Sequence, residues 1–250
     1  MSSRRPHLSV VIPAYNEAER LPPTLDRIAD YFATEGVDYE VVVSDDGSTD
    51  KTVAVAESHL RKGLDRVLAQ VENRGKGAAV RAGVHGARGR WLLLCDADLS
   101  TPIEEYEKLA AAARDHDRDI VIGSRGLVDS DIEERQSAVR QLMGKTFNVI
   151  LRAMTALPFR DTQCGFKLMD SARVKPLFDL MVIDRFAFDV ELLLLARRFK
   201  LTVEELPIVW RNKEHSRVNM LLDPPNMLMD VARVRWRMRT GGYNPAPPAP

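Results

Sequence analysis

Two carboxylates stand two residues apart at positions 96 and 98, directly after the apolar run Trp91–Cys95. A strand that ends in a turn can direct both Asp96 and Asp98 at one divalent cation, and hard carboxylate oxygens suit Mg²⁺ or Mn²⁺. The competing interpretation is a helix cap with a solvated turn, because Ser100-Thr-Pro102 is typical of a helix start. The position at the end of an apolar strand favours the metal site.

Three further polar clusters follow apolar runs, at residues 13–17, 45–50 and 123–125. The second, Asp-Asp-Gly-Ser-Thr-Asp, has the composition of a turn, but its carboxylates can also accept hydrogen bonds from a nucleobase or a ribose. Residues 73–77, Asn-Arg-Gly-Lys-Gly, fit either a weak anion site at a helix start or a flexible helix start alone. They lack the spacing of a P-loop.

The first half of the chain alternates short apolar runs with helical spacing of apolar residues. We expect strands at residues 8–12, 39–44, 66–71, 91–95 and 119–123, and helices at 17–33, 52–60, 75–87 and 102–114. Asp50 is the expected cap of the second helix. This alternation predicts an α/β fold with a Rossmann-like, mostly parallel central sheet and helices on both faces. Ligands of such sheets bind beyond the carboxyl ends of the strands, where the polar clusters fall.

The second half is less regular, with expected helices at 139–157, 186–199 and 226–239 and an expected strand at 203–210. The last helix has one apolar stripe, formed by Met227, Val231, Val234 and Met238. Arginines surround this stripe at positions 233, 235, 237 and 239. Such a helix either binds an anionic membrane surface or packs its stripe on the protein core. Both interpretations also apply to helix 139–157.

The chain of 250 residues has 36 basic and 36 acidic side chains, so its formal net charge is zero. This balance argues against a dedicated nucleic-acid-binding protein. Two cysteines, Cys95 and Cys164, imply no disulfide framework and fit a reducing compartment. No apolar run reaches the ~20 residues that a membrane helix needs, so we expect a soluble or peripheral protein. Residues 1–7 are expected to be a flexible N-terminus and residues 241–250 a disordered Pro-rich tail.

The polar motifs closely resemble those of family 2 glycosyltransferases of GT-A fold. The segments that carry this resemblance are Val11–Glu17, Asp45–Asp50, Asn73–Gly77 and Asp96–Asp98. Further motifs resemble the polyprenyl/dolichyl-phosphate glycosyltransferase branch, above all its dolichyl-phosphate β-glucosyltransferase type. These are Gly123-Ser-Arg125, Asp161-Thr-Gln-Cys-Gly-Phe-Lys167, and Trp210 with Ser216-Arg217-Val218.

The resemblance implies a role for individual residues. The nucleotide-sugar donor is expected to contact Pro13, Ala14, Tyr15, Glu17, Asp45, Asp46, Lys76, Asp96, Ala97, Gln163, Ser216 and Arg217. The same resemblance implies that Asp96 and Asp98 hold the metal, and that the acceptor phosphate is bound by Arg125, Arg135 and Arg140. The sugar and acceptor region is expected to be lined by Gln163, Phe188, Asp189 and Glu191. The expected catalytic residues are Asp98, Asp189 and Arg125.

The resemblance also implies a single GT-A catalytic domain over residues 8–240. Its expected parts are a nucleotide-sugar-binding half (8–125), an acceptor-binding half (126–218) and a membrane-interface helix (219–240). The expected reaction is a metal-dependent, inverting transfer of a hexose, with glucose and a UDP-sugar favoured, to a polyprenyl phosphate. A phosphate acceptor needs no general base, whereas a hydroxyl acceptor would make Asp189 the candidate base.

Several alternatives stay open at this point. The donor is alternatively UDP-N-acetylhexosamine or GDP-mannose, and the acceptor alternatively a sugar hydroxyl. A nucleotidyltransferase would carry a Gly-rich loop after the first strand, where this chain has Pro13–Glu17 instead. A non-catalytic sugar-nucleotide-binding adaptor is the least favoured function. We expect a cytoplasmic protein, peripheral on the cytoplasmic face of a membrane, with a separate membrane protein as a further candidate partner and no nucleic acid.

Overall fold

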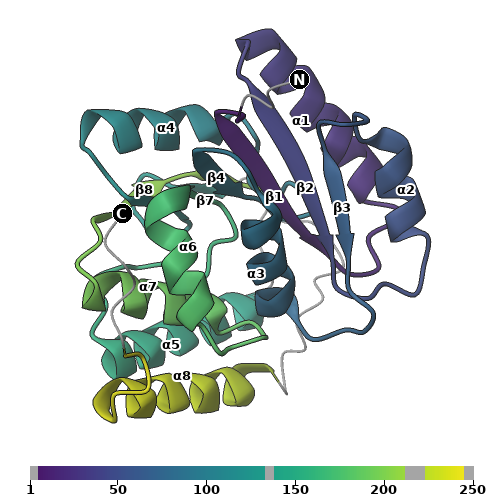
Figure 1. Cartoon of the computed structure of the whole chain (residues 1–250). Coiled ribbons are helices and arrows are strands. Elements are labelled where there is room, and N and C mark those ends of the chain that lie inside the picture. Colours follow the sequence, from purple (N-terminus) through teal and green to yellow (C-terminus); the bar gives the residue numbers. More distant parts are fainter. Residues whose placement is uncertain (1–4, 133–137, 212–222, 245–250) are drawn as a thin grey trace.

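The computed structural model describes residues 5–132, 138–211 and 223–244, with all side chains of these ranges except those of 138–142 and 145 (Figure 1). Its centre is a seven-stranded sheet in the order β3-β2-β1-β4-β7-β5-β8. The strands are β1 (Leu8–Ala14), β2 (Tyr39–Asp45), β3 (Arg66–Ala69), β4 (Trp91–Leu94), β5 (Ile120–Ser124), β7 (Lys167–Asp170) and β8 (Val203–Pro207). A separate parallel pair joins β6 (Asp131–Ile132) to β9 (Val209–Trp210).

Helices cover both faces of this sheet, as the sequence predicted (Figure 1). One face packs on α1 (Leu21–Glu35), α2 (Thr52–His59) and α4 (Glu105–Asp115). The other packs on α3 (Lys76–Gly86), α6 (Ser171–Leu180) and α7 (Phe188–Arg198), with α5 (Ala138–Thr155) and α8 (Asp223–Arg239) beyond them. Successive buried residues of one strand serve opposite faces: Val10 and Ile12 meet the first set and Val11 the second. This is the period-2 pattern of a strand buried on both sides.

The sheet is parallel except at β7, which runs antiparallel to β4 and β5. Neither β7 nor α6 was predicted from the sequence, in which residues 161–167 stand out only as a motif. Asp170 ends β7 and caps α6, because its side chain accepts hydrogen bonds from the backbone N–H groups of Ala172 and Arg173. Pro176 inside this ten-residue helix weakens its helical pattern.

Two smaller corrections concern element ends. The first helix begins at Leu21 and not at Glu17, because residues 17–20 form a turn in which the Glu17 carbonyl accepts from Arg20 and Leu21. Asp50 accepts hydrogen bonds from the backbone and hydroxyl of Thr52, but the helix-capping position itself is occupied by Lys51.

The apolar stripe of α8 packs on the protein and not on a membrane. Met227, Val231 and Val234 are buried in the core beside α5 and α7. The other sides of α8 expose Met229 (63%) and Trp236 (65%). Within the described ranges, none of the helices combines the length and apolar character needed to cross a bilayer.

Candidate active site

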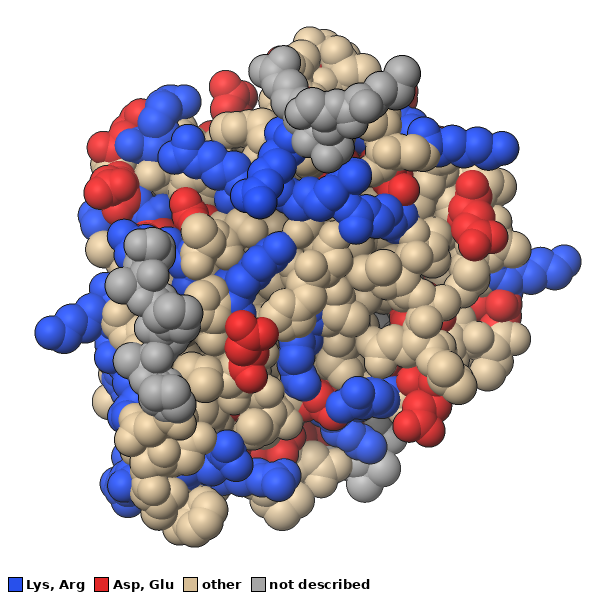
Figure 2. Space-filling model, viewed as in Figure 1, with Lys and Arg blue, Asp and Glu red and all other residues tan. Residues whose placement is uncertain are grey.

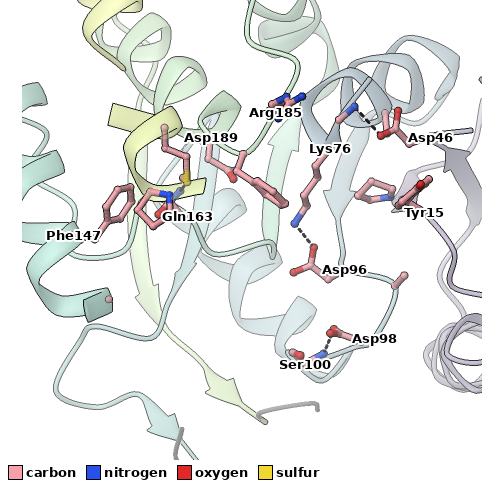
Figure 3. A pocket seen from close by; sticks show the side chains of 18 of the residues that line it. Tyr15, Asp46, Lys76, Asp96, Asp98, Ser100, Phe147, Gln163, Arg185 and Asp189 are labelled. Atoms are coloured by element: carbon pink, nitrogen blue, oxygen red, sulfur yellow. Dashed lines mark hydrogen bonds and ion pairs between the residues drawn. The ribbon is translucent and has the colours of Figure 1, made fainter. Parts of the chain in front are cut away.

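A cavity of about 1090 Å³ opens at the carboxyl ends of β1, β2, β4 and β5, beside α3, α5, α7 and α8 (Figure 3). Twelve of the predicted site residues line it: Pro13, Ala14, Tyr15, Glu17, Asp46, Lys76, Asp96, Ala97, Asp98, Arg125, Gln163 and Asp189. The structure therefore brings together residues that the sequence separates by as many as 176 positions, from Pro13 to Asp189. Parallel strands place their carboxyl ends along one edge, which explains the convergence.

Three predicted residues lie away from the cavity lining. Phe188 and Glu191 are fully buried, so the prediction that they line the sugar and acceptor region is wrong. Glu191 instead accepts hydrogen bonds from Tyr243 and from the backbone of Val182 and Ile183, which joins the chain end to α7. Asp45 is buried behind the cavity, where its Oδ2 accepts from the Ser48 N–H. The predicted residues Arg135, Ser216 and Arg217, and the side chain of Arg140, fall outside the described part of the chain.

The loops after β1 and β2 are joined by hydrogen bonds that centre on Asn16. Its side-chain oxygen accepts from the Thr49 N–H at 2.9 Å, and its own N–H donates to the Ser48 hydroxyl at 2.8 Å. Asn16 holds a left-handed conformation, with φ 54°, which asparagine tolerates better than most residues. The next residue, Glu17, donates its N–H to the Thr52 hydroxyl. Together these bonds fix the loop after β1, which forms the wall of the cavity at Tyr15.

Asp46 connects this wall to the start of α3. Its two carboxylate oxygens accept from the backbone N–H groups of Arg74 and Gly75, at 3.0 and 2.8 Å. Burial raises the pKa of Asp46, and the two backbone hydrogen bonds oppose that rise. Gly75 has φ 121° and packs on the Asp184 carbonyl, so a side chain there would meet backbone. The segment therefore places Lys76 at the first residue of α3, facing the cavity.

Lys76 forms an ion pair with Asp96 across the cavity (Figure 3). Its Nζ lies 2.6 Å from Asp96 Oδ1, and both side chains are partly exposed, at 25% and 37%. Burial alone would lower the pKa of Lys76, but the carboxylates of Asp96 and Asp189 outweigh it and raise that pKa. Burial alone would raise the pKa of Asp96, but the Lys76 ammonium outweighs it and lowers that pKa. Both groups are therefore charged near neutral pH.

Asp98 lies on the same turn with a different set of partners. Its Oδ1 accepts from the Ser100 N–H at 2.9 Å, and its Oδ2 is 3.9 Å from the Arg20 guanidinium. Arg20 in turn makes two bonds of 2.6 Å to the carboxylate of Glu17. The metal-site interpretation and the turn interpretation of Asp98 are therefore compatible, because one oxygen stabilises the turn while the side chain still lines the cavity.

Two more ion pairs each join a cavity-lining side chain to a buried partner. Arg125 makes two side-chain hydrogen bonds to Asp161, at 2.6 and 3.0 Å, and its guanidinium lies 5.6 Å from the centre of the Trp210 ring. Lys167 is fully buried, and its Nζ lies 2.6 Å from Asp189 Oδ1. Burial raises the pKa of Asp189, and the Lys167 ammonium opposes that rise. The predicted Asp161–Lys167 motif thus supplies the counter-charges for two predicted catalytic residues.

Comparison with known proteins identifies the family. Residues 9–174 match the family model described as glycosyl transferase family 2. The chain belongs to this family. Over 249 residues it is 38% identical to a dolichyl-phosphate beta-glucosyltransferase of Drosophila melanogaster, a match that covers 94% of this chain and 76% of that protein. The family prediction from the strand-end motifs is confirmed.

Solved structures of other glycosyltransferases share the fold. Mannosyl-3-phosphoglycerate synthase from Rubrobacter xylanophilus has a TM-score of 0.69 at 21% identity, covering 96% of this chain and 76% of that one. Glucosyl-3-phosphoglycerate synthase from Mycobacterium tuberculosis, crystallised with Mn²⁺ and UDP-glucose, has a TM-score of 0.63 at 17% identity, covering 95% and 79%. The predicted GT-A fold is confirmed, while the division of this family 2 chain into halves remains a prediction.

The carboxylates at this site of the family 2 protein fit a divalent cation. Asp96 and Asp98 both line the cavity, and each already has a cationic group of the chain near its oxygens. Carboxylate oxygens of this kind suit Mg²⁺ or Mn²⁺, which usually keep waters or phosphate oxygens as further ligands. Among the described residues, no cluster of three or more His, Cys, Asp or Glu is placed to hold a metal.

Gly165 lies in the Asp161–Lys167 motif, and no role was predicted for it. A Cβ built on Gly165 would overlap the carboxylate of Asp96. The Asp96 carboxylate can therefore take its observed position only because residue 165 has no side chain. Arg20 and Arg185 also line the cavity and were not predicted. The spacing of Glu17 and Arg20, three residues apart, was the available signal for Arg20.

We expect Gly165→Ala to lower kcat/KM by about 10²-fold, because it displaces a carboxylate that must hold its position to within an ångström. Steady-state kinetics of both proteins measure the loss. Gly36→Ala is the control: it strains a left-handed turn at the far end of α1, with φ 64°, and should cost stability without costing activity. Equal activity of G165A and the unmodified protein would contradict the assigned role of this glycine.

Proposed function

We propose that this chain transfers a hexose, with glucose and UDP-glucose favoured, to a polyprenyl phosphate such as dolichyl phosphate. The product would be a β-linked lipid-phosphate sugar, because direct displacement inverts an α-linked donor. The names of the curated relatives support a glucosyl group and dolichyl phosphate, and a neighbour of the same fold was crystallised with UDP-glucose. In the chain itself, support comes from the two chemically different ends of the cavity.

One end of the cavity is polar and the other is apolar. The polar end carries Tyr15, Asp46, Lys76 and the two aspartates of the turn, Asp96 and Asp98. The opposite end is lined from α5 and α8 by Met143, Phe147, Ile150, Pro224, Met227 and Leu228. Apolar side chains suit a hydrocarbon tail, whereas a soluble sugar acceptor would need polar partners there. The proposal of a lipid-phosphate acceptor rests on this observation, that one cavity joins a charged end to an apolar end.

Each polar group has a proposed task. Asp46 and the wall of Tyr15 hold the nucleoside, and Arg125 binds the acceptor phosphate. Asp161 fixes the Arg125 guanidinium in one orientation, which suits a planar cation that recognises phosphate. A Mg²⁺ or Mn²⁺ held by Asp96 and Asp98 would stabilise the charge that develops on the leaving diphosphate.

Asp189 acts in this proposal as a positioning residue and not as a base. The acceptor phosphate is already an anion near neutral pH, so no proton has to be removed from it. The Lys167 ammonium, 2.6 Å from Asp189 Oδ1, holds the Asp189 side chain in place. Asp189 is thereby suited to orient a hydroxyl of the transferred sugar.

A donor and acceptor panel tests the proposed reaction. Radiolabelled UDP-glucose, UDP-N-acetylglucosamine and GDP-mannose are each incubated with the chain and polyprenyl phosphate in vesicles, with Mn²⁺ or with a chelator. We expect labelled glycolipid from UDP-glucose above all, and none with the chelator. A soluble β-glucoside acceptor is the matched control. Transfer only to that hydroxyl acceptor, or no metal-dependent transfer to either, would refute the proposal.

We further propose that the outer surface of α5 and α8 rests peripherally on the cytoplasmic face of a membrane. Exposed apolar side chains that do not line the cavity lie on these two helices, namely Val149, Met229 and Trp236. Lys and Arg side chains mix with uncharged ones along the edge where α8 lies (Figure 2). The two free, buried cysteines fit the reducing compartment on that side of a membrane.

Reversing two exposed charges of α8, in Arg233→Glu/Arg239→Glu, should weaken binding to anionic phosphatidylserine vesicles by at least about tenfold, because each basic residue contributes to surface attraction. Vesicle sedimentation measures the binding. Lys51→Glu/Lys62→Glu makes the same charge change on exposed residues flanking α2 and should leave binding nearly unchanged. Equal losses in both variants would indicate an effect of net charge, and no loss in either would exclude α8 as the contact.

A further inference from the structure

The lysine at the start of α3 occupies the position that a cation would need beside Asp96. Lys76 Nζ lies 2.6 Å from Asp96 Oδ1, and Gly165 packs against the same carboxylate, nearest to its Oδ2. The Lys76 ammonium and any cation that enters the cavity therefore compete for the exposed part of the Asp96 carboxylate. Like charges at such short range repel strongly in a partly buried site. A divalent cation can bind Asp96 fully only when Lys76 moves away.

Lys76 has both the freedom and an alternative anion for such a movement. Its side chain is a flexible four-carbon stem and is 25% exposed in the cavity. It stands at the first residue of α3, where the helix dipole favours an anion. A donor diphosphate in this cavity would supply that anion.

Arg20 contrasts with Lys76 at the neighbouring carboxylate. Its guanidinium makes two bonds of 2.6 Å to Glu17 and approaches Asp98 only to 3.9 Å. A cation at Asp98 therefore does not require Arg20 to leave its main partner. Lys76 has its 2.6 Å contact with the candidate metal ligand itself. This difference singles out Lys76 as the group that must exchange.

We propose that Lys76 holds the place of the divalent cation at Asp96 before the donor binds, and turns to the donor phosphates once the cation has entered. This inference rests on the proposed function, because it takes Asp96 as a metal ligand. It predicts opposite effects of one substitution on two ligands, which a residue with a purely structural role would not produce.

The test measures Mn²⁺ binding to the full chain without nucleotide, by electron paramagnetic resonance, and UDP binding at saturating Mn²⁺, by calorimetry. Lys76→Met should bind Mn²⁺ about tenfold more tightly than the unmodified protein, because the competing ammonium is gone. The same variant should bind UDP about tenfold more weakly, because a phosphate contact is lost. Lys76→Arg keeps the charge and should leave Mn²⁺ affinity within about twofold.

Two outcomes separate failure of this inference from failure of the metal site. If Asp96→Asn loses Mn²⁺ binding but Lys76→Met binds Mn²⁺ no more tightly than the unmodified protein, the exchange is refuted and the metal site stands. If Asp96→Asn binds Mn²⁺ as well as the unmodified protein, both are refuted. Lys76→Gln serves as the second neutral variant, so that a folding defect in Lys76→Met, detected by thermal unfolding, does not decide the result.

Discussion

Replacing Asp96 by asparagine is expected to lower kcat/KM for glycosyl transfer by about 10³-fold. An amide is a poor ligand for a hard divalent cation and cannot neutralise its charge, so the stabilisation of the leaving diphosphate would be lost. The fold should remain, because the Asp96 carboxylate is 37% exposed and its partner Lys76 can turn to solvent. Initial rates over a range of Mn²⁺ concentrations measure the effect.

Two further variants make this prediction specific. Asp98→Asn should show a loss of similar size with its turn intact, because an asparagine oxygen can still accept from the Ser100 N–H. Asp26→Asn, an exposed position on α1, is the matched control and should change neither activity nor stability. An Asp96→Asn protein that keeps more than a tenth of the activity at saturating Mn²⁺ would contradict the assignment of Asp96 as a metal ligand.

The sequence was sufficient where local pattern and chemistry coincide. Continuous apolar runs marked β1, β2, β4 and β5, and the polar residue types after them marked the cavity edge. Asp96, Lys76 and Tyr15 were predicted on this basis and all line the cavity. Parallel topology then guarantees that such strand ends meet, whatever their separation along the chain.

The sequence was insufficient where a residue's environment depends on distant packing. Phe188 and Glu191 stand on the same helix as Asp189, but a helix turns by about 100° per residue, so neighbours of a cavity residue face the core. β7 was missed because its first residue, Lys167, is charged. The Asp189 carboxylate on α7 and the Cys164 carbonyl explain how this lysine can be buried. The apolar stripe of α8 was ambiguous for the same reason, since a core and a membrane favour the same stripe.

The ion pairs explain how a cavity with so many charges can be stable without a ligand. Asp96, Asp161 and Asp189 each have a lysine or arginine within 2.6 Å, and Glu17 has Arg20. Because these charges balance locally, a donor diphosphate and a divalent cation of comparable and opposite charge can enter together without leaving an uncompensated charge. The balance of acidic and basic residues in the whole chain is thus repeated at this site, where four carboxylates each have a basic partner.

The buried pair of Lys167 and Asp189 should have the largest effect on stability. Asp189→Asn leaves the Lys167 ammonium without its counter-charge at a fully buried position, which should lower the free energy of unfolding by about 3 kcal/mol. Lys167→Met/Asp189→Leu removes both charges and should recover most of that loss. Urea unfolding of the three proteins measures the difference. A loss below about 1 kcal/mol for Asp189→Asn would show that the Lys167 ammonium does not depend on the Asp189 carboxylate.

The same substitution decides the role of Asp189 in chemistry. With a phosphate acceptor, Asp189→Asn should slow turnover by about tenfold or less at a temperature where it is folded, because no proton has to be removed. Glu40→Gln removes a buried carboxylate that pairs with Arg88 near the start of β2, away from the cavity, so it should cost stability and leave turnover unchanged. If Asp189→Asn instead slows turnover by about 10³-fold or more, with KM unchanged and Glu40→Gln fully active, Asp189 is a general base. The acceptor would then be a hydroxyl group, because only an acceptor that gives up a proton makes the rate depend on a base in this way.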